Sequence, residues 1–207
     1  MSEYSFSAGW GSGQDNWTQA IQKYNTSARK FLEIGSYEGK SATFLLDSVF
    51  EKNKPYELFC VDTWEGGEEH QEAAMPLAES NFDLNVGKAL QKEGHGDFRV
   101  IKLKGTSRLV LANLISSGHA GTFDFIYVDG SHQCPDVLTD LTLSFILADI
   151  GGIIVCDDYT WFPNVRWGSL LHSPKMAIDS FSNCFWDKVA LTDMGLPGQP
   201  IFVKIAH

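Results

Sequence analysis

Residues 31–41 read Phe31-Leu-Glu-Ile-Gly-Ser-Tyr-Glu-Gly-Lys-Ser41, a short apolar run that leads into a turn with two glycines. The run is continuous rather than alternating, which is typical of a strand buried on both faces. Gly35 and Gly39 let the backbone turn tightly and let a ligand approach closely. Apolar residues with helical spacing follow over 41–50. Strand, glycine turn and helix in this order indicate the first unit of an α/β sheet.

The same alternation continues along the chain. Seven apolar runs predict strands at 31–34, 58–61, 100–103, 123–128, 153–156, 188–191 and 201–205. Helical spacing or capping residues predict helices at 15–24, 41–50, 106–115, 135–147 and 174–185. Residues 193–200 carry two glycines and two prolines and predict a hairpin-type connection, so the last strand is expected to be antiparallel. We therefore expect a mostly parallel α/β sheet with helices on both faces.

Composition bounds the class of protein. The 207 residues predict a single domain, 1–207, in which 1–26 form an N-terminal helical or lid segment before a core at 27–207. A net charge of −10 argues against a nucleic-acid partner, which needs a basic surface, and favours a small molecule. No run approaches the roughly 18 apolar residues of a membrane span. The polar N-terminus lacks the pattern of a signal peptide, so we expect a cytoplasmic protein; a homo-oligomer stays open.

The turn after the first strand has two interpretations. Gly39-Lys40-Ser41 fits the end of the phosphate-binding P-loop, G-x-x-x-x-G-K-[ST]. However, the position five before Gly39 is Ile34, and Gly35 makes the loop one residue short. Glu33 would place a carboxylate beside bound phosphates, whereas it suits a cationic ligand with an amino group. A P-loop nucleotide hydrolase, with Asp129 as its Mg²⁺-associated acid, is the competing enzyme class.

The next two strand ends offer further ligand contacts. In open α/β sheets, ligands bind beyond the carboxyl ends of the strands. Asp62 ends the second strand and can accept hydrogen bonds from both hydroxyls of a ribose; capping of the next turn is its structural alternative. The small residues of Gly105-Thr106-Ser107 follow the third strand and leave room for a flat adenine ring.

Three carboxylates follow the fourth and fifth strands. Asp129 ends one of them, and Asp157 and Asp158 end the other. If these strands are neighbours, the carboxylates meet at one edge with little nearby Lys or Arg, and they repel one another. A hard divalent cation relieves that repulsion and prefers oxygen ligands. Helix capping is the alternative for any one of the three.

Taken together, these stretches resemble a known family. They are Glu33-Ile-Gly-Ser-Tyr-Glu-Gly-Lys-Ser41, Val61-Asp-Thr-Trp64 with Gly66 and His70, Tyr127-Val-Asp-Gly-Ser-His132, and Cys156-Asp-Asp-Tyr159. In order and spacing, over about residues 31–205, the chain is similar to class I methyltransferases, in particular to macrolide-sugar O-methyltransferases and, more distantly, to catechol O-methyltransferases. The glycine turn departs from the family by lacking its G-x-G core.

The resemblance implies a Rossmann-like seven-stranded sheet, S-adenosylmethionine as methyl donor, and a hydroxyl of a small molecule, such as a sugar or an aromatic natural product, as acceptor. It implies Mg²⁺, or another hard divalent cation, on Asp129, Asp157 and Asp158, and it gives His132 the place of the catalytic base. The residues expected at the donor are Glu33, Gly35, Ser36, Tyr37, Gly39, Ser41, Asp62, Thr63, Gly105, Thr106, Ser107 and Asp129.

Two points stay open at the level of sequence. A non-catalytic domain that binds the donor or its product would also have this fold, although mere binding needs no metal site. Aromatic residues near the strand ends favour an acceptor pocket or lid, with core packing as the alternative for each; they are Trp64, Tyr159, Trp161, Phe162 and Trp167.

Overall fold

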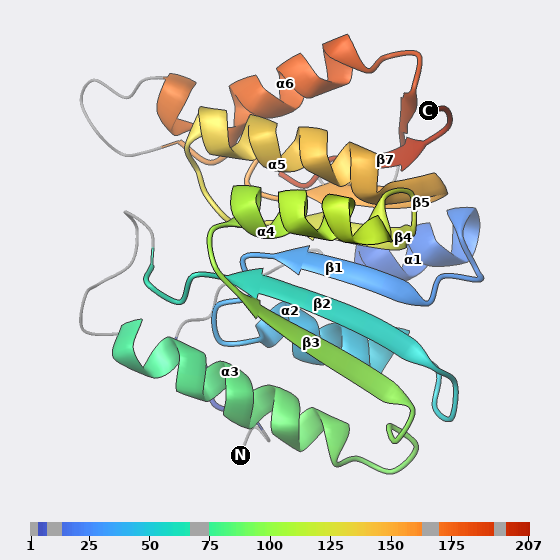
Figure 1. Ribbon diagram of the computed structural model, residues 1–207, viewed down its shortest axis with the longest axis vertical. Coiled ribbons are helices and arrows are strands. Elements are labelled where there is room, and N and C mark those ends of the chain that lie inside the picture. The colour runs from blue at the N-terminus through green and yellow to red at the C-terminus, as the bar shows by residue number, and fades with distance from the viewer. Residues whose placement is uncertain (1–3, 8–13, 67–74, 163–169, 193–197) are drawn as a thin grey trace.

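The computed structural model describes residues 4–7, 14–66, 75–162, 170–192 and 198–207 (Figure 1). The strands are β1 (Lys30–Ile34), β2 (Tyr56–Asp62), β3 (Phe98–Lys104), β4 (Phe123–Val128), β5 (Ala148–Cys156), β6 (Val189–Leu191) and β7 (Ile201–Lys204). The helices are α1 (Asp15–Tyr24), α2 (Lys40–Phe44), α3 (Met75–Leu90), α4 (Ser107–Leu114), α5 (Cys134–Leu147) and α6 (Pro174–Cys184). Single π-helical turns extend α2 over Leu45–Val49 and α4 over Ile115–His119, and a short 3-10 turn covers Leu170–His172.

All seven strands form one sheet in the order β3-β2-β1-β4-β5-β7-β6. The strands from β3 to β5 are parallel, and β7 lies antiparallel between β5 and β6. The chain runs outward from β1 to β3 and then returns to place β4 on the other side of β1. The strand order therefore reverses between β1 and β4, which is where open α/β sheets bind ligands. The predicted fold class and the antiparallel last strand are confirmed.

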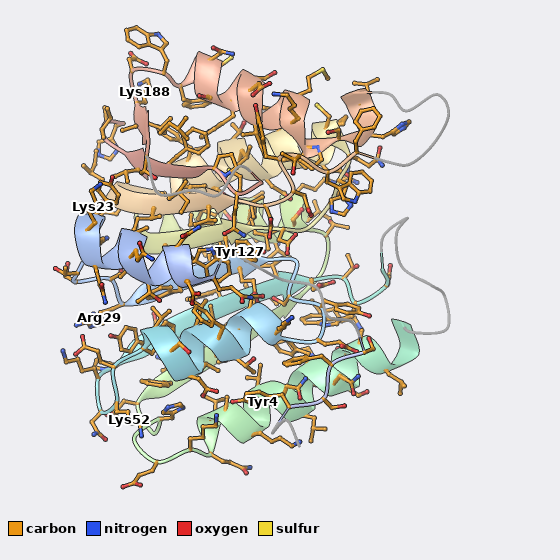
Figure 2. The ribbon with its side chains drawn as sticks, turned by 180° about the vertical axis from the view of Figure 1, so that it is seen from behind. Tyr4, Lys23, Arg29, Lys52, Tyr127 and Lys188 are labelled. Atoms are coloured by element: carbon orange, nitrogen blue, oxygen red, sulfur yellow. The ribbon has the colours of Figure 1, made fainter. Side chains whose placement is uncertain are left out.

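Helices cover both faces of the sheet (Figures 1 and 2). Successive strand residues point to opposite faces, so Phe31 packs with α1, α2 and α3, while its neighbour Leu32 packs with α4, α5 and α6. The side chains of Phe31 and Leu32 are both fully buried. Because both faces of the strands are buried, nearly every residue in them is apolar, which explains the continuous apolar runs in the sequence.

The predicted helices are confirmed, and one helix was missed. Ser173 caps α6 by accepting a hydrogen bond from the Lys175 backbone N–H, as its position before Pro174 predicts. Residues 63–97 were left without an element, yet they contain α3, which lies along the face of the sheet beside β2 and β3 (Figure 1). Within the described part of the chain, no helix has the length and apolar character needed to cross a membrane.

Candidate functional site

The turns after β1 and β4 touch each other at the point where the strand order reverses. Gly35 has φ +90°, and a Cβ atom there would lie 1.9 Å from the carbonyl oxygen of Asp129. Gly39 has φ +79°, and its Cβ would crowd Phe82 of α3 at 3.1 Å. Both glycines make the tight turn that the sequence predicts. At both positions, atoms of the chain itself leave no room for a side chain.

Asp62 holds the glycine loop (residues 35–39) in place. Its carboxylate accepts the backbone N–H of Tyr37 at 2.7 Å and that of Trp64 at 2.7 Å. Both of these residues have positive φ, +43° and +54°, and the two hydrogen bonds help to hold them in this conformation. The indole Nε1 of Trp64 donates to the carbonyl of Tyr37 at 2.8 Å. The hydroxyl of Thr63, which stands between Asp62 and Trp64 in the chain, accepts a hydrogen bond from the backbone N–H of Glu65 at 3.2 Å.

Glu33 is buried at the carboxyl end of β1, where it meets the start of α2. The Ser41 hydroxyl donates to Glu33 Oε1, and burial raises the pKa of the Glu33 carboxyl. Among the described residues, the buried atoms Glu33 Oε2 and Ser36 Oγ have no hydrogen-bond partner. In a P-loop, Ser41 and the turn before it would face phosphate groups. The buried Glu33 carboxyl beside Ser41 is unfavourable for binding phosphate there. The P-loop interpretation is therefore not favoured.

The turn after β3 reaches the same edge of the sheet. Gly105 donates its backbone N–H to the carbonyl of Asp62 at 2.9 Å, which joins the ends of β2 and β3. Thr106 then precedes α4, and Ser107 is its first residue. Helix α4 packs against α5, which carries Asp140. This carboxyl is 2% exposed, and burial raises its pKa to about 7, a shift that the Ser107 side chain opposes. The predicted adenine turn thus leads into a helix that packs on the helix following β4.

The three carboxylates predicted to bind a metal lie at the ends of β4 and β5, where, among the described residues, Asp157 is linked to Asp129 only through Tyr127. One hydroxyl, Tyr127 Oη, lies 2.8 Å from Asp129 Oδ2 and also contacts Asp157 Oδ2. It has a single proton and donates to one carboxylate at a time. Burial, followed by the negative charges of Asp157 and Asp158, raises the pKa of Asp129 well above its usual range. In the acid cluster (Asp129, Asp157 and Asp158), the negative charge of all three carboxylates at once is therefore disfavoured unless positive charge is added.

His132 lies beside Asp158. The ring Nε2 is 2.6 Å from Asp158 Oδ2, and the imidazole stacks on Trp161 with ring centroids 4.1 Å apart. Single ligand atoms of Asp129, His132 and Asp158 lie within 4.8 Å of one another, close enough to hold one metal ion. Asp157 faces elsewhere: its Oδ2 accepts from Tyr127 and from Gln199 Nε2 at 3.0 Å, and its Oδ1 accepts from the Asp158 backbone.

A family model described as "Methyltransferase domain" matches residues 32–159, which run from β1 to just beyond the acid cluster. The chain belongs to this methyltransferase family. Its curated relatives include a probable caffeoyl-CoA O-methyltransferase of Dictyostelium discoideum, 25% identical over 136 residues. That alignment covers 66% of this chain and 46% of the relative. The chain thus spans about half the length of the curated relatives it matches.

Solved methyltransferases share the fold. An O-methyltransferase from Bacillus cereus in complex with SAH is 17% identical, with a TM-score of 0.64 over 95% of this chain and 83% of that one. The O-methyltransferase TomG from Streptomyces achromogenes, in complex with SAM, is 16% identical, with a TM-score of 0.61 over 95% and 82%. This methyltransferase therefore has the overall architecture that its motifs imply.

The aromatic residues near the strand ends, predicted to form an acceptor pocket or lid, lie in different environments. Trp64 is 5% exposed and packs on Phe82, so it belongs to the core. Tyr159 hydrogen-bonds to Asp179 at 2.9 Å, whereas Phe162 is 48% exposed. Of the four that the structure describes, Trp161 stacks on a predicted site residue, His132. Trp167 and His70 lie outside the described residues.

Three residues at the site escaped sequence reasoning. Tyr127 joins two of the acids, Gln199 donates to Asp157, and the indole of Trp17 on α1 donates to Gln199 Oε1 at 2.8 Å. Trp17 and Gln199 are 182 positions apart, so no local pattern relates them. Tyr127 carried a signal, because it stands two residues before Asp129 and so shares its face of the strand.

Proposed function

We propose that this chain is an S-adenosylmethionine-dependent O-methyltransferase that acts on a hydroxyl of a small molecule. The observation that carries the proposal is that two different sets of residues meet where the strand order reverses, between β1 and β4. A glycine loop held by Asp62 lies on one side, and a surplus of carboxylates with a histidine lies on the other. Donor and acceptor then approach each other across the boundary between β1 and β4.

The donor half is assigned to the turns after β1, β2 and β3. Each Asp62 oxygen already accepts one backbone N–H and keeps a second lone pair, so it can also accept a ribose hydroxyl. The unpartnered buried atoms of Glu33 and Ser36 fit a ligand that brings its own hydrogen-bonding groups. The names of the solved neighbours, which were crystallised with SAM or SAH, support this assignment.

The acid cluster fits a hard divalent cation, Mg²⁺ by preference. Its carboxylates repel one another and offer oxygen ligands. Asp129 and Asp158 are placed to bind together, with His132 beside them. Asp157, the third ligand predicted from the sequence, would have to share an oxygen with Tyr127 and Gln199. A cation bound there would lower the pKa of an acceptor hydroxyl.

His132 is assigned the role of base. The methyl group leaves the donor sulfur, which keeps the electron pair of the broken bond, and a bond forms from the acceptor oxygen to the methyl carbon. The acceptor loses its proton, which the His132 imidazole takes up. Asp158 orients the ring through Nε2 and stabilises the imidazolium, and Trp161 holds the ring plane by stacking. Positioning of this kind accounts for a large share of catalysis in two-substrate reactions.

The acceptor we propose is a sugar or an aromatic natural product. Trp161 offers a flat apolar wall beside His132, which suits a ring or a sugar face. The names of two curated relatives refer to caffeoyl-CoA, a compound with an aromatic ring. We also propose that residues 1–207 act as one catalytic unit, because Trp17 of α1 is fully buried and its indole reaches the acid cluster through Gln199.

The test is calorimetry with adenosylhomocysteine, which resembles the donor and is not consumed. We expect the Asp62→Asn variant to bind it about tenfold or more weakly than the wild type, since a charge-assisted hydrogen bond contributes ~1.5–3 kcal/mol. Glu57→Gln is the matched control, because Glu57 lies toward the amino end of the same strand and pairs with Arg99. Tight binding of ATP with no response to adenosylhomocysteine would overturn the proposal in favour of a nucleotide hydrolase.

A further inference from the structure

A short N-terminal segment lies against the outside of the glycine loop. Residues 4–7, which we call the strap, run beside α3, where Tyr4 is labelled in Figure 2. Ser5 and Ser7 are exposed, and Tyr4 donates its hydroxyl to Asp47 at 2.6 Å. The contacts of Ser7 with the loop join residues 30 and 31 positions apart in sequence, so they are tertiary.

Asn85 of α3 joins the strap to the loop. This side chain is fully buried. Its amide pairs with the backbone of Ser5 in both directions, accepting the N–H at 3.0 Å and donating to the carbonyl at 2.8 Å. The same amide nitrogen donates to the carbonyl of Glu38 at 3.0 Å. One buried amide therefore serves the strap and the loop at once.

Glu38 makes the second connection, through its side chain. It is 2% exposed, although it is a charged residue in a turn. Its Oε2 accepts the backbone N–H of Ser7 at 2.6 Å, and its Oε1 accepts from Asn81 of α3 at 2.8 Å. The Ser7 hydroxyl also lies 3.1 Å from the hydroxyl of Tyr37. A buried carboxylate of this kind is costly unless it is hydrogen-bonded, so the strap supplies part of what keeps Glu38 inside.

The loop residues that the strap holds are those next to the proposed donor site. Tyr37 and Glu38 stand between Gly35 and Gly39, and the Tyr37 N–H is bound by Asp62. The loop is thus held from two sides, by Asp62 at the sheet and by the strap with α3 on the outside. A donor that requires the loop in this conformation gains affinity from the outer contacts without touching them.

We propose that the strap and Asn85 position the glycine loop, so that donor binding and docking of the strap are energetically coupled. This inference rests on the proposed donor site. Coupling of this kind is reciprocal: if the docked strap tightens the donor, then the donor must stabilise the docked strap by the same factor.

The first experiment removes one hydrogen bond at an exposed position. Ser7→Pro eliminates the N–H that Glu38 accepts, whereas the matched variant Ser7→Ala keeps that N–H and loses only the hydroxyl. By calorimetry with adenosylhomocysteine, Ser7→Pro should bind about 5- to 150-fold more weakly than Ser7→Ala, the usual range for coupled sites. Ser7→Pro should also lower the thermal midpoint without ligand relative to Ser7→Ala, because the buried Glu38 carboxylate loses one donor. The affinities are therefore compared at a temperature well below both midpoints.

The second experiment tests the reciprocal effect on the unaltered chain. Chymotrypsin cleavage after Tyr4 and Phe6, followed by mass spectrometry, should slow when adenosylhomocysteine is present. In Asn85→Asp, a carboxylate cannot donate to the two carbonyls, and the ligand should protect the strap less. Asn81→Asp, which alters only the Glu38 side-chain contact, provides a graded comparison.

Two outcomes overturn this inference while leaving the proposed function intact. They are equal adenosylhomocysteine affinity in Ser7→Pro and Ser7→Ala, and cleavage of the strap at the same rate with and without ligand. Absence of binding by the wild-type protein instead contradicts the proposed function itself.

Discussion

Carboxylates have different partners in the two halves of the candidate site, the turns after β1, β2 and β3 (the donor half) and the acid cluster with His132 (the acid half). On the donor side, Asp62 accepts two backbone N–H groups, and Glu38 accepts one more N–H and a side-chain amide. On the acid side, Asp129 and Asp157 compete for the one hydroxyl of Tyr127. Asp62 and Glu38 thus find their partners within the chain, whereas on the acid side burial and the charges of Asp157 and Asp158 disfavour ionisation of Asp129.

This difference indicates what each half is built to receive. Carboxylates that accept backbone N–H groups fix a loop, and the loop then presents a ready conformation to a ligand. Carboxylates left in mutual repulsion favour an added cation or proton. The donor half is therefore expected to tolerate loss of a metal, and the acid half to respond to it.

The largest effect we predict is that of His132→Ala on turnover. Removal of a general base lowers rates by about 10²–10⁴. The affinity for adenosylhomocysteine should stay nearly unchanged, because His132 lies in the acid half. Turnover is measured as release of adenosylhomocysteine with an acceptor found by screening hydroxyl compounds. His119→Ala is the control, since that histidine contacts Lys30 at the amino end of β1.

The metal affinity of the same variant distinguishes the two roles open to His132. Loss of turnover with unchanged Mn²⁺ binding identifies the base, whereas loss of both identifies a metal ligand. Full turnover in His132→Ala would contradict the assignment.

The second prediction compares two adjacent acids. Mn²⁺ binding, followed by electron paramagnetic resonance, should fall in Asp158→Asn by more than the roughly 10- to 100-fold typical of a residue that only supports a ligand. Asp157→Asn should stay within that range, because Asp157 faces Tyr127 and Gln199. Equal losses would restore the three-carboxylate site predicted from the sequence. Turnover that survives EDTA undiminished would remove the metal from the acid half altogether.

The smallest effect concerns Asp140, at the junction of the two halves. Its Oδ2 lies 3.6 Å from the position that a Cβ atom on Gly130, next to Asp129 in the chain, would take. Burial, assisted by the charge of Asp136, raises its pKa to about 7, against ~3.9 in an unfolded chain. The folded protein then holds a proton that the unfolded chain releases, so this contribution to stability is complete below about pH 4. It is lost as the pH rises to about 7.

Asp140→Asn should therefore be more stable than the wild type above pH 7, and the difference should shrink as the pH falls toward 4. Thermal denaturation from pH 5 to pH 8 measures this. Asp187→Asn, at an exposed aspartate, serves as the control. A pH-independent difference between Asp140→Asn and the wild type would contradict the raised pKa.

The sequence predicted most of the fold because strands buried on both faces leave continuous apolar runs. Helix α3 escaped because apolar residues stand on more than one of its faces: Leu77 and Leu84 are 60% and 49% exposed, while Phe82 is buried. The buried Asn85 further obscured the apolar stripe. Strand order was also beyond the sequence, since nothing local places β4 beside β1.

The sequence predicted at which strand end each site residue lies, but not the direction in which its side chain points. Asp62 and the acid cluster lie where the motifs placed them. The direction of each side chain depends on single backbone angles, as at Asp158, whose φ of +57° turns the chain immediately after Asp157. Asp157 consequently faces Tyr127 and Gln199, whereas Asp158 faces His132. The periodicity of the sequence does not predict this difference in partners.

The contact between Gly35 and the carbonyl of Asp129 has one more consequence. The turns after β1 and β4 touch at a point where not even a methyl group fits. If donor and acceptor bind at these turns, as we propose, this contact fixes the distance between them before either one binds. A displacement of about 1 Å can cost ~10²-fold in rate. Gly35→Ala is therefore expected to lower turnover by forcing the two turns apart, while every polar group of both halves stays in the chain.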